Sequence, residues 1–221
     1  MLDRPHSRIA LVAICGPTCA GKTTLANALR RAEPSLSPVV TTTTRPPRPG
    51  EVHERDYHFV TDEAFRAKLA EGALLEHDRV FANFYGIETV ELARIVSSGR
   101  TGVAVITPAG LEPARSLCRS LGTDLLTVFV GATRETLILR LLNRFSTERE
   151  DRAAHYATRL VQLLDSLATW QADRYDVAEP NFGPDSVSDV VGRIQDALRR
   201  PTVRAAARPL RSYRACVQQR L

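Results

Sequence analysis

Two adjacent stretches decide the fold: RIALVAIC at residues 8–15 and GPTCAGKT at residues 16–23. The first is a continuous apolar, β-branched run, which is typical of a strand buried on both faces of a parallel sheet. The second fits the pattern G-x-x-x-x-G-K-[ST], whose glycines let backbone N–H groups wrap a phosphate. A helix pattern follows at residues 22–32. Strand, loop and helix therefore stand in the order that a phosphate-binding loop requires.

Strand and helix patterns alternate along most of the remaining chain. The expected strands lie at 8–15, 39–43, 57–60, 102–107, 124–130 and 175–178, and the expected helices at 22–32, 61–71, 88–98, 109–120, 133–143, 152–173 and 185–199. This alternation predicts an α/β fold with a central parallel sheet. The segment 44–98, with a proline-rich loop and a hairpin pattern at 74–85, interrupts the alternation and predicts an inserted lobe of mixed pairing.

The composition is that of a globular protein. The chain has 221 residues, of which 43% are hydrophobic and 25% are charged, enough for one sizeable domain or two small ones. No apolar run reaches the roughly 18 residues of a membrane span. The apolar run at 8–15 leads directly into the glycine loop, so we expect a core strand rather than an export signal. Four irregularly spaced cysteines suit reduced thiols in a cytoplasmic protein.

The positive charge is concentrated in a tail. The net charge is +5, and residues 199–221 hold seven arginines and no acid, so residues 1–198 carry −2. We expect the tail to be a solvated extension; the alternative is an arm that touches nucleic acid or a protein partner. Outside the tail, no nucleic-acid partner is expected, and the sequence leaves a monomer or a homo-oligomer open.

A series of ordered motifs then resembles one family. TTRPPRPGE at 43–51, DYHF at 56–59, LLE at 74–76 and NFYG at 83–86 resemble the acceptor-binding segments of guanylate kinases. The resemblance covers about residues 8–198. It implies a P-loop NTPase fold with a monophosphate-binding lobe at 42–100 and a helical lid at 143–158. It also implies transfer of the γ-phosphoryl group of ATP, with Mg²⁺ as cofactor, to GMP or dGMP.

The donor side of this expectation rests on the glycine loop and on arginines of the lid. Lys22 can reach the β- and γ-phosphates of ATP, and the Thr23 hydroxyl can bind Mg²⁺. Arg140 and Arg144 share a helix face and resemble the lid arginines of the family. Arg159 resembles a further catalytic arginine. The expected ATP-binding residues are Gly16, Pro17, Thr18, Cys19, Ala20, Gly21, Lys22, Thr23 and Thr24.

With Arg159 in that role, the lid segment 145–158 is about one helical turn longer than the family pattern, so Arg152 is the alternative third catalytic arginine. Positioned cations of this kind neutralise charge that spreads over the transferred phosphoryl group. The expected catalytic residues are therefore Lys22, Arg140, Arg144 and Arg159.

The acceptor side rests on cations, hydroxyls and one carboxylate. Arg45 and Arg48 stand in a loop stiffened by prolines, and each guanidinium can bind a phosphate with two hydrogen bonds. The carboxylate of Glu76 can accept from N1–H and N2–H₂ of guanine, a donor pair that adenine lacks. The expected acceptor-binding residues are Thr41, Arg45, Arg48, Glu51, Tyr57, Glu76, Tyr85 and Thr107.

Two departures from the family pattern open an alternative acceptor. Ile87 stands where the family has Ser or Thr, and Thr107 stands where it has Asp, although Gly110 is retained. The same phosphoryl transfer to ribose 1,5-bisphosphate or to a modified nucleotide is therefore the second hypothesis. A third is a non-catalytic module that binds phosphoproteins, but the glycine loop of such modules is typically degraded, whereas this chain keeps Gly21, Lys22 and Thr23.

Overall fold

The computed structural model describes residues 8–80, 82–147, 160–161, 175–180 and 182–199. The expected helix at 152–173, the lid beyond residue 147 and the tail from residue 200 lie almost wholly outside these ranges. Within the described ranges, no helix is long and apolar enough to cross a membrane.

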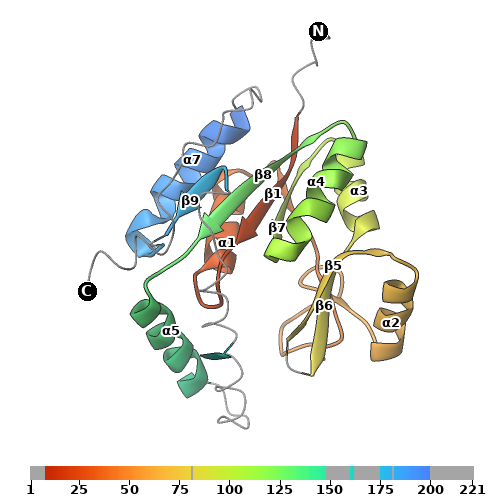
Figure 1. Cartoon of the computed structure of the whole chain (residues 1–221), viewed down its shortest axis with the longest axis horizontal. Helices are drawn as coiled ribbons and strands as arrows, with labels where there is room; N and C mark the ends of the chain where they lie inside the picture. Colours follow the sequence, from red (N-terminus) through yellow and green to blue (C-terminus); the bar gives the residue numbers. More distant parts are fainter. Residues whose placement is uncertain (1–7, 81, 148–159, 162–174, 181, 200–221) are drawn as a thin grey trace. The chain divides into compact units, whose positions relative to one another are not determined.

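The core of the fold is a five-stranded sheet with the order β2-β7-β1-β8-β9 (Figure 1). Its strands are Leu36–Pro38, Thr101–Val105, Ile9–Cys15, Asp124–Val130 and Val177–Glu179, in that order. The pairs β2–β7 and β8–β9 are parallel. All seven residues of β1 are buried, as its apolar run predicts. The expected α/β class with a central parallel sheet is confirmed.

The chain divides into two compact units, with boundaries within β1, after residue 32 and within β8. Unit 1 comprises residues 1–13 and 33–125, and unit 2 comprises residues 14–32 and 126–221. The acceptor motifs of the sequence all fall in unit 1, and the glycine loop falls in unit 2.

Unit 1 carries the inserted lobe as a second sheet with the order β4-β3-β6-β5. Its strands are His58–Phe59, Thr42–Thr43, Asn83–Glu88 and Leu74–Val80. Helix α2 (Asp62–Ala70) lies beside the β5–β6 hairpin (Figure 1), where the ring of Phe65 stacks on that of Phe84 at 5.3 Å. The unit is completed by α3 (Thr89–Ser97), the 3-10 turn η1 (Pro108–Gly110) and α4 (Leu111–Ser120).

Unit 2 contains the helix that follows the glycine loop. This helix, α1 (Lys22–Ala32), buries Leu25 and Leu29 and packs against α7 (Val187–Arg199), which also packs on β9. Two further elements belong to the unit, α5 (Arg134–Thr147) and the 3-10 turn η3 (Pro184–Ser186).

The sequence predicted the long elements more closely than the short ones. The bounds of α1 and β8 match, and the hairpin exists as β5–β6. The β-rich segment 39–43 instead contributes only the two residues of β3. The expected strand at 102–107 ends at Val105, because Thr107 already caps η1: its hydroxyl accepts from the Gly110 N–H.

Candidate active site

The glycine loop of unit 2 adopts a backbone that few residues allow. Gly16 and Gly21 have positive φ angles of 154° and 100°, and Cys19 is a non-glycine residue at 61°. A Cβ atom on Gly16 would lie 2.0 Å from the carbonyl oxygen of Val130. Only glycine fits there, both for conformation and for space.

Two cations hold the loop by its carbonyl groups. The Nζ atom of Lys22 donates to the carbonyls of Gly16 at 2.8 Å and Pro17 at 2.9 Å. The guanidinium of Arg140 donates to the carbonyls of Cys19 at 3.3 Å and Ala20 at 3.4 Å. Arg140, expected as a lid residue, therefore contacts the loop itself.

The N–H groups of the loop remain available to an anion. Among the residues that the structure describes, the N–H groups of Cys19, Gly21 and Thr23 have no hydrogen-bond acceptor. Gly21 and Thr23 stand at the N-terminal end of α1, where the helix dipole favours negative charge. This arrangement suits a phosphate group.

A residue from the C-terminal part of unit 2, Phe182, also packs against the glycine loop. A Cβ atom on Gly21 would lie 2.7 Å from the ring of Phe182. The N–H of Phe182 donates to Gly131 at 2.7 Å, and its carbonyl accepts from Arg140 at 3.0 Å. Phe182 was missed by the sequence reasoning, because no local pattern links it to the glycine loop.

The other donor residues are only partly described. Thr23 and Thr24 are exposed in the first turn of α1, so the Thr23 hydroxyl is accessible to a metal ion. Arg144 lies on α5, but the structure does not describe its side chain. Arg152 and Arg159 lie outside the described residues.

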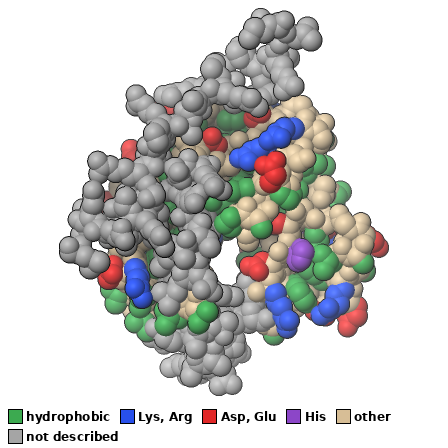
Figure 2. All heavy atoms as spheres, in the orientation of Figure 1, with side chains coloured by type: hydrophobic (Ala, Val, Ile, Leu, Met, Phe, Trp, Pro, Cys, Tyr) green, Lys and Arg blue, Asp and Glu red, His purple; other side chains and the backbone are tan. Residues whose placement is uncertain are grey.

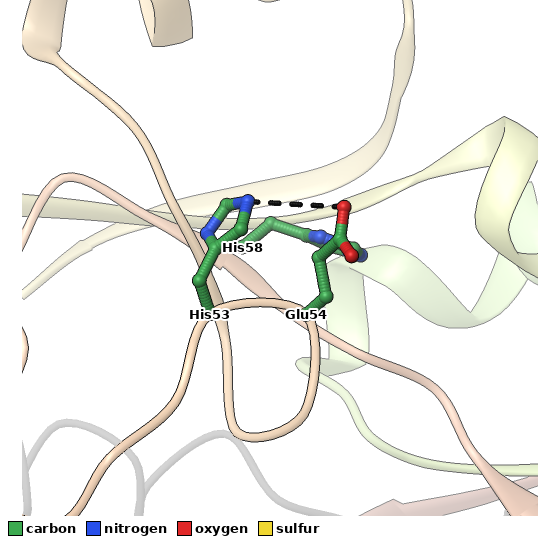
Figure 3. Close-up of side chains that lie close together, drawn as sticks. All are labelled: His53, Glu54 and His58. Atoms are coloured by element: carbon green, nitrogen blue, oxygen red, sulfur yellow. Dashed lines mark ion pairs between the residues drawn. The ribbon is translucent and has the colours of Figure 1, made fainter.

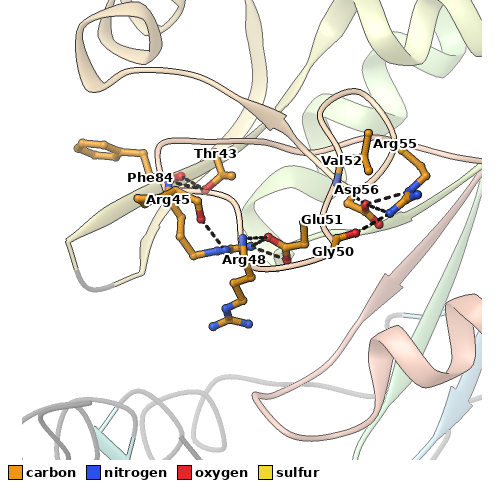
Figure 4. A network of polar contacts seen from close by, with 10 residues as sticks. Thr43, Arg45, Arg48, Gly50, Glu51, Val52, Arg55, Asp56 and Phe84 are labelled. Carbon is orange, nitrogen blue, oxygen red and sulfur yellow. Dashed lines mark hydrogen bonds and ion pairs between the residues drawn. The ribbon is translucent and has the colours of Figure 1, made fainter. Parts of the chain in front are cut away.

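In unit 1, the arginine–proline loop is organised around Glu51 (Figure 4). The guanidinium of Arg45 donates to both carboxylate oxygens of Glu51 at 2.8 Å, and the N–H of Arg48 donates to Oε2 at 2.8 Å. The Arg48 N–H and the Arg45 charge lower the pKa of Glu51 despite some burial. Glu51, expected as an acceptor-binding residue, thus holds the two arginines of its own loop.

The two arginines differ in how they are held. The Arg45 guanidinium lies 5.4 Å from the ring centre of Tyr57 and 5.8 Å from that of Phe59. Burial opposes its charge, yet Glu51 keeps the pKa of Arg45 above its ordinary value. Arg48 is exposed, and its guanidinium points away from Glu51 (Figure 4). Arg45 is therefore preorganised, whereas Arg48 can turn toward a ligand.

The expected tyrosines lie together beside this loop. The rings of Tyr57 and Tyr85 meet edge to face with centres 6.2 Å apart. Burial, followed by the proximity of Tyr85, raises the pKa of Tyr57, so its hydroxyl remains a neutral donor. Thr41 is half-buried and its carbonyl accepts from the His58 N–H at 2.9 Å.

Glu76 is a part-buried carboxylate on β5 of unit 1. It pairs with Ile87 across the β5–β6 ladder, after a register shift between Leu74 and Glu76. Its Oε2 atom accepts from the Thr107 hydroxyl at 2.5 Å and from the Thr107 N–H at 2.9 Å. Burial raises the pKa of Glu76 to about 7, although the Thr107 hydrogen bonds oppose the shift. Ile87 is only 2% exposed and belongs to the core.

A second cluster, His53, Glu54 and His58, could be read as a metal site (Figure 3). The Nδ1 atom of His53 accepts from the Phe59 N–H at 3.0 Å, so the neutral ring carries its proton on Nε2. That Nε2 atom lies 3.9 Å from Glu54 Oε1. A metal on Nε2 would move the proton to Nδ1, where it would face the Phe59 N–H. The cluster therefore fits hydrogen bonding rather than metal binding.

The described surface shows no concentration of one charge on the face in Figure 2, where basic and acidic side chains are interspersed. Ion pairs such as Arg66–Asp62 at 2.6 Å and Arg115–Glu112 at 3.1 Å balance many of the arginines.

Comparison with known proteins adds the family. The guanylate kinase family model matches residues 8–199. The guanylate kinase of Ruegeria sp. (strain TM1040) is 33% identical over 198 residues, which cover 89% of this chain and 88% of that protein. That of Paramagnetospirillum magneticum is 34% identical and covers 86% of this chain and 85% of that protein.

A solved structure, the guanylate kinase of Anaplasma phagocytophilum, has the same fold, with a TM-score of 0.63 and 23% identity. The similarity covers 99% of this chain and 98% of that one. Motifs, fold and sequence matches agree over nearly the whole chain, and the protein belongs to the guanylate kinase family.

Proposed function

We propose that this protein is a nucleoside-monophosphate kinase that transfers the γ-phosphoryl group of ATP to GMP or dGMP, giving ADP and GDP or dGDP. One observation carries the proposal. Unit 1 presents a preorganised arginine, Arg45, in the loop after β3, and a part-buried carboxylate, Glu76, on β5 of the same four-stranded sheet. Together they match the two ends of a guanine nucleotide: its phosphate and the donor edge of its base.

The glycine loop supports the donor role. Its N–H groups and Lys22 would hold the β- and γ-phosphates of ATP. Thr23 would hold Mg²⁺ through its exposed hydroxyl, with phosphate and water oxygens as the other ligands, because Mg²⁺ keeps an oxygen shell. When bound, the ion would neutralise charge on the phosphates.

The acceptor would be held in unit 1. Arg45 and Arg48 would bind its phosphate, with Tyr57 and Tyr85 as neutral donors. Glu76 would accept from the base through Oε1, which has no hydrogen-bond partner among the described residues. Thr41 and Thr107 complete the expected acceptor residues.

In the proposed step, an oxygen of the GMP phosphate attacks the γ-phosphorus, and the bond to the bridging oxygen of ADP breaks. No general base is required, since the acceptor phosphate is already a nucleophile. Arg140, Arg144 and Arg159 would neutralise charge on the transferred group. Arg140 supports this role by its contact with the glycine loop.

The buried carboxylate disfavours an acceptor without a base. A sugar bisphosphate would leave Oε1 of Glu76 unpaired in a part-buried site, which is unfavourable. The intact glycine loop likewise disfavours a module that only binds phosphoproteins.

The test is an acceptor panel with ADP release as the readout. GMP, dGMP, AMP and ribose 1,5-bisphosphate are compared at saturating ATP and Mg²⁺. We expect GMP and dGMP to exceed AMP by at least ~100-fold in kcat/KM, because a mismatched base leaves buried polar groups unpaired. Preferred use of the sugar bisphosphate would overturn the guanine assignment, and failure to bind ATP in calorimetry would overturn the kinase assignment.

We also propose that the protein acts in the cytoplasm on small nucleotides. Among the described residues Cys15, Cys19 and Cys118 are thiols that form no disulfide bond, which suits a reducing compartment.

A further inference from the structure

Thr107 directs both of its donors to one atom. Its hydroxyl and its N–H donate to Glu76 Oε2 at 2.5 and 2.9 Å. The same hydroxyl accepts from the Gly110 N–H at 3.3 Å. Because the Gly110 N–H occupies a lone pair of the hydroxyl, the hydroxyl proton is left to point at Glu76.

We infer that Thr107 is a positioning residue of the acceptor site: it fixes Glu76 Oε2 as an ionised acceptor, so that Oε1 is presented to the base. This inference rests on the proposed function. This role differs from a direct contact with the base, because the Thr107 hydroxyl donates its proton to Glu76 and acts on the base only through that carboxylate.

The surrounding backbone leaves room for this geometry. A Cβ atom on Gly110 would lie 2.3 Å from Glu76 Oε2 and 2.7 Å from its Cδ atom. On the other side, the register shift in β5 turns the strand just before Glu76. The segment Thr107–Gly110 and the irregular strand together form a socket that fits one carboxylate orientation.

Among the described residues, no cation helps Thr107 to stabilise the charge of Glu76. Burial is the main cause that disfavours the charge of Glu76, and Asp78 on the same strand adds to it. Across the ladder β6 offers the apolar Ile87, and η1 consists of Pro108, Ala109 and Gly110. The first ionisable residue of α4, Glu112, is 67% exposed and pairs with Arg115.

The geometry also fixes where a proton would go. Both Thr107 donors occupy Oε2, so a proton added to Glu76 would sit on Oε1. That atom would then be a donor facing the N–H donors of guanine, and base binding would be lost. Because its hydrogen bonds oppose the effect of burial, Thr107 lowers the pH below which Glu76 no longer accepts from the base.

The first test compares Thr107→Val, which removes the hydroxyl at nearly constant shape, with Thr107→Ser, which keeps it. For Thr107→Val we expect kcat/KM for GMP at pH 7 to fall ~10-fold, mainly through KM. We expect the acid limb of the pH profile of kcat/KM for GMP to move up by about one pH unit, while KM for ATP stays constant. The phosphate of GMP titrates equally in all variants, and Thr107→Ser should restore both values. An unmoved acid limb, or a serine variant that behaves like valine, overturns the inference.

The second test needs no turnover. Protein labelled with ¹³C in its glutamate side chains is titrated by NMR, and the Glu76 signal is identified by its absence in Glu76→Gln. The apparent pKa of Glu76 should be higher in Thr107→Val than in the wild type; an equal value overturns the inference. If the valine variant does not fold, Thr107→Ala is measured instead. Wild-type protein that ignores GMP but shows the NMR shift would refute the proposed function and leave the positioning role standing.

Discussion

The glycine loop and the acceptor lobe both suit phosphate binding, but the loop does so mainly with backbone groups and the lobe with side chains. The loop uses backbone N–H groups, three residues with positive φ and one lysine. The lobe uses side chains: a guanidinium held by Glu51 and a carboxylate held by Thr107. A backbone cradle tolerates few substitutions, whereas a side-chain site can change its partners one residue at a time. The departures from the family pattern at positions 87 and 107 both fall in unit 1, outside the glycine loop.

The largest expected effect would test the loop. We predict that Lys22→Ala abolishes turnover and leaves the fold intact, because a lost charge contact to a phosphate costs at least ~1.5–3 kcal/mol, or about 10- to 150-fold. The measurement is kcat together with Tm. Lys68→Ala is the matched control, since Lys68 pairs with Glu88 at 2.8 Å in unit 1. Retention of more than about a tenth of wild-type kcat in Lys22→Ala would contradict the role of Lys22.

The next largest effect would test the role of the Glu76 carboxylate in the acceptor lobe. Glu76→Gln keeps the shape but places an amide donor where guanine needs an acceptor. We expect kcat/KM for GMP to fall ~5- to 150-fold, with KM for ATP unchanged. Kinetics at varied GMP and saturating ATP decide this. If GMP kinetics do not change, the base is bound elsewhere.

Replacing Arg45 would show whether the acceptor lobe binds GMP independently of ATP binding at the glycine loop. Arg45→Ala should raise KM for GMP ~10- to 50-fold and leave KM for ATP nearly constant, because a charge-assisted bidentate contact to the acceptor phosphate is lost. Arg55→Ala is the control: Arg55 is 63% exposed and pairs with Asp56. Equal increases in both KM values would mean that Arg45 has been assigned to the wrong substrate.

The smallest effect is a pH dependence. The pKa of Glu76 is about 7, so its ionised, accepting form falls from about half at pH 7 to about a tenth at pH 6. We expect kcat/KM for GMP to fall ~5-fold over that range from Glu76 alone. The phosphate of GMP titrates nearby, so the profile of Glu76→Gln serves as the baseline. Parallel profiles in the two proteins would show that Glu76 does not titrate there.

The sequence predicted what repeats along the chain or is fixed by a motif. The buried strand, the glycine loop and α1 follow from continuous apolar residues and spaced glycines; the bounds of α1 match, and β1 begins one residue later than predicted. The roles of Glu51 and Thr107 could not be predicted, because each depends on a long-range contact or a local turn. The contact from Thr107 to Glu76 spans 31 residues, and it depends on a register shift that no local pattern marks.

The sequence also placed Arg140 on the lid by its helix spacing. Its contacts with Cys19 and Ala20 span more than 100 residues, which no periodicity can show. Such side-chain contacts between distant segments depend on tertiary packing rather than on local propensity.

The packing of Phe182 against Gly21 has a consequence for biosynthesis. About 160 residues separate the two positions, and Arg140 joins the loop from a third segment. At 5–20 residues per second, the ribosome needs roughly 10–30 s to make the intervening chain. The glycine loop is thus synthesised about 160 residues before Phe182, which packs against it. A chain truncated before residue 182 would carry the intact motif without the contacts that shape it.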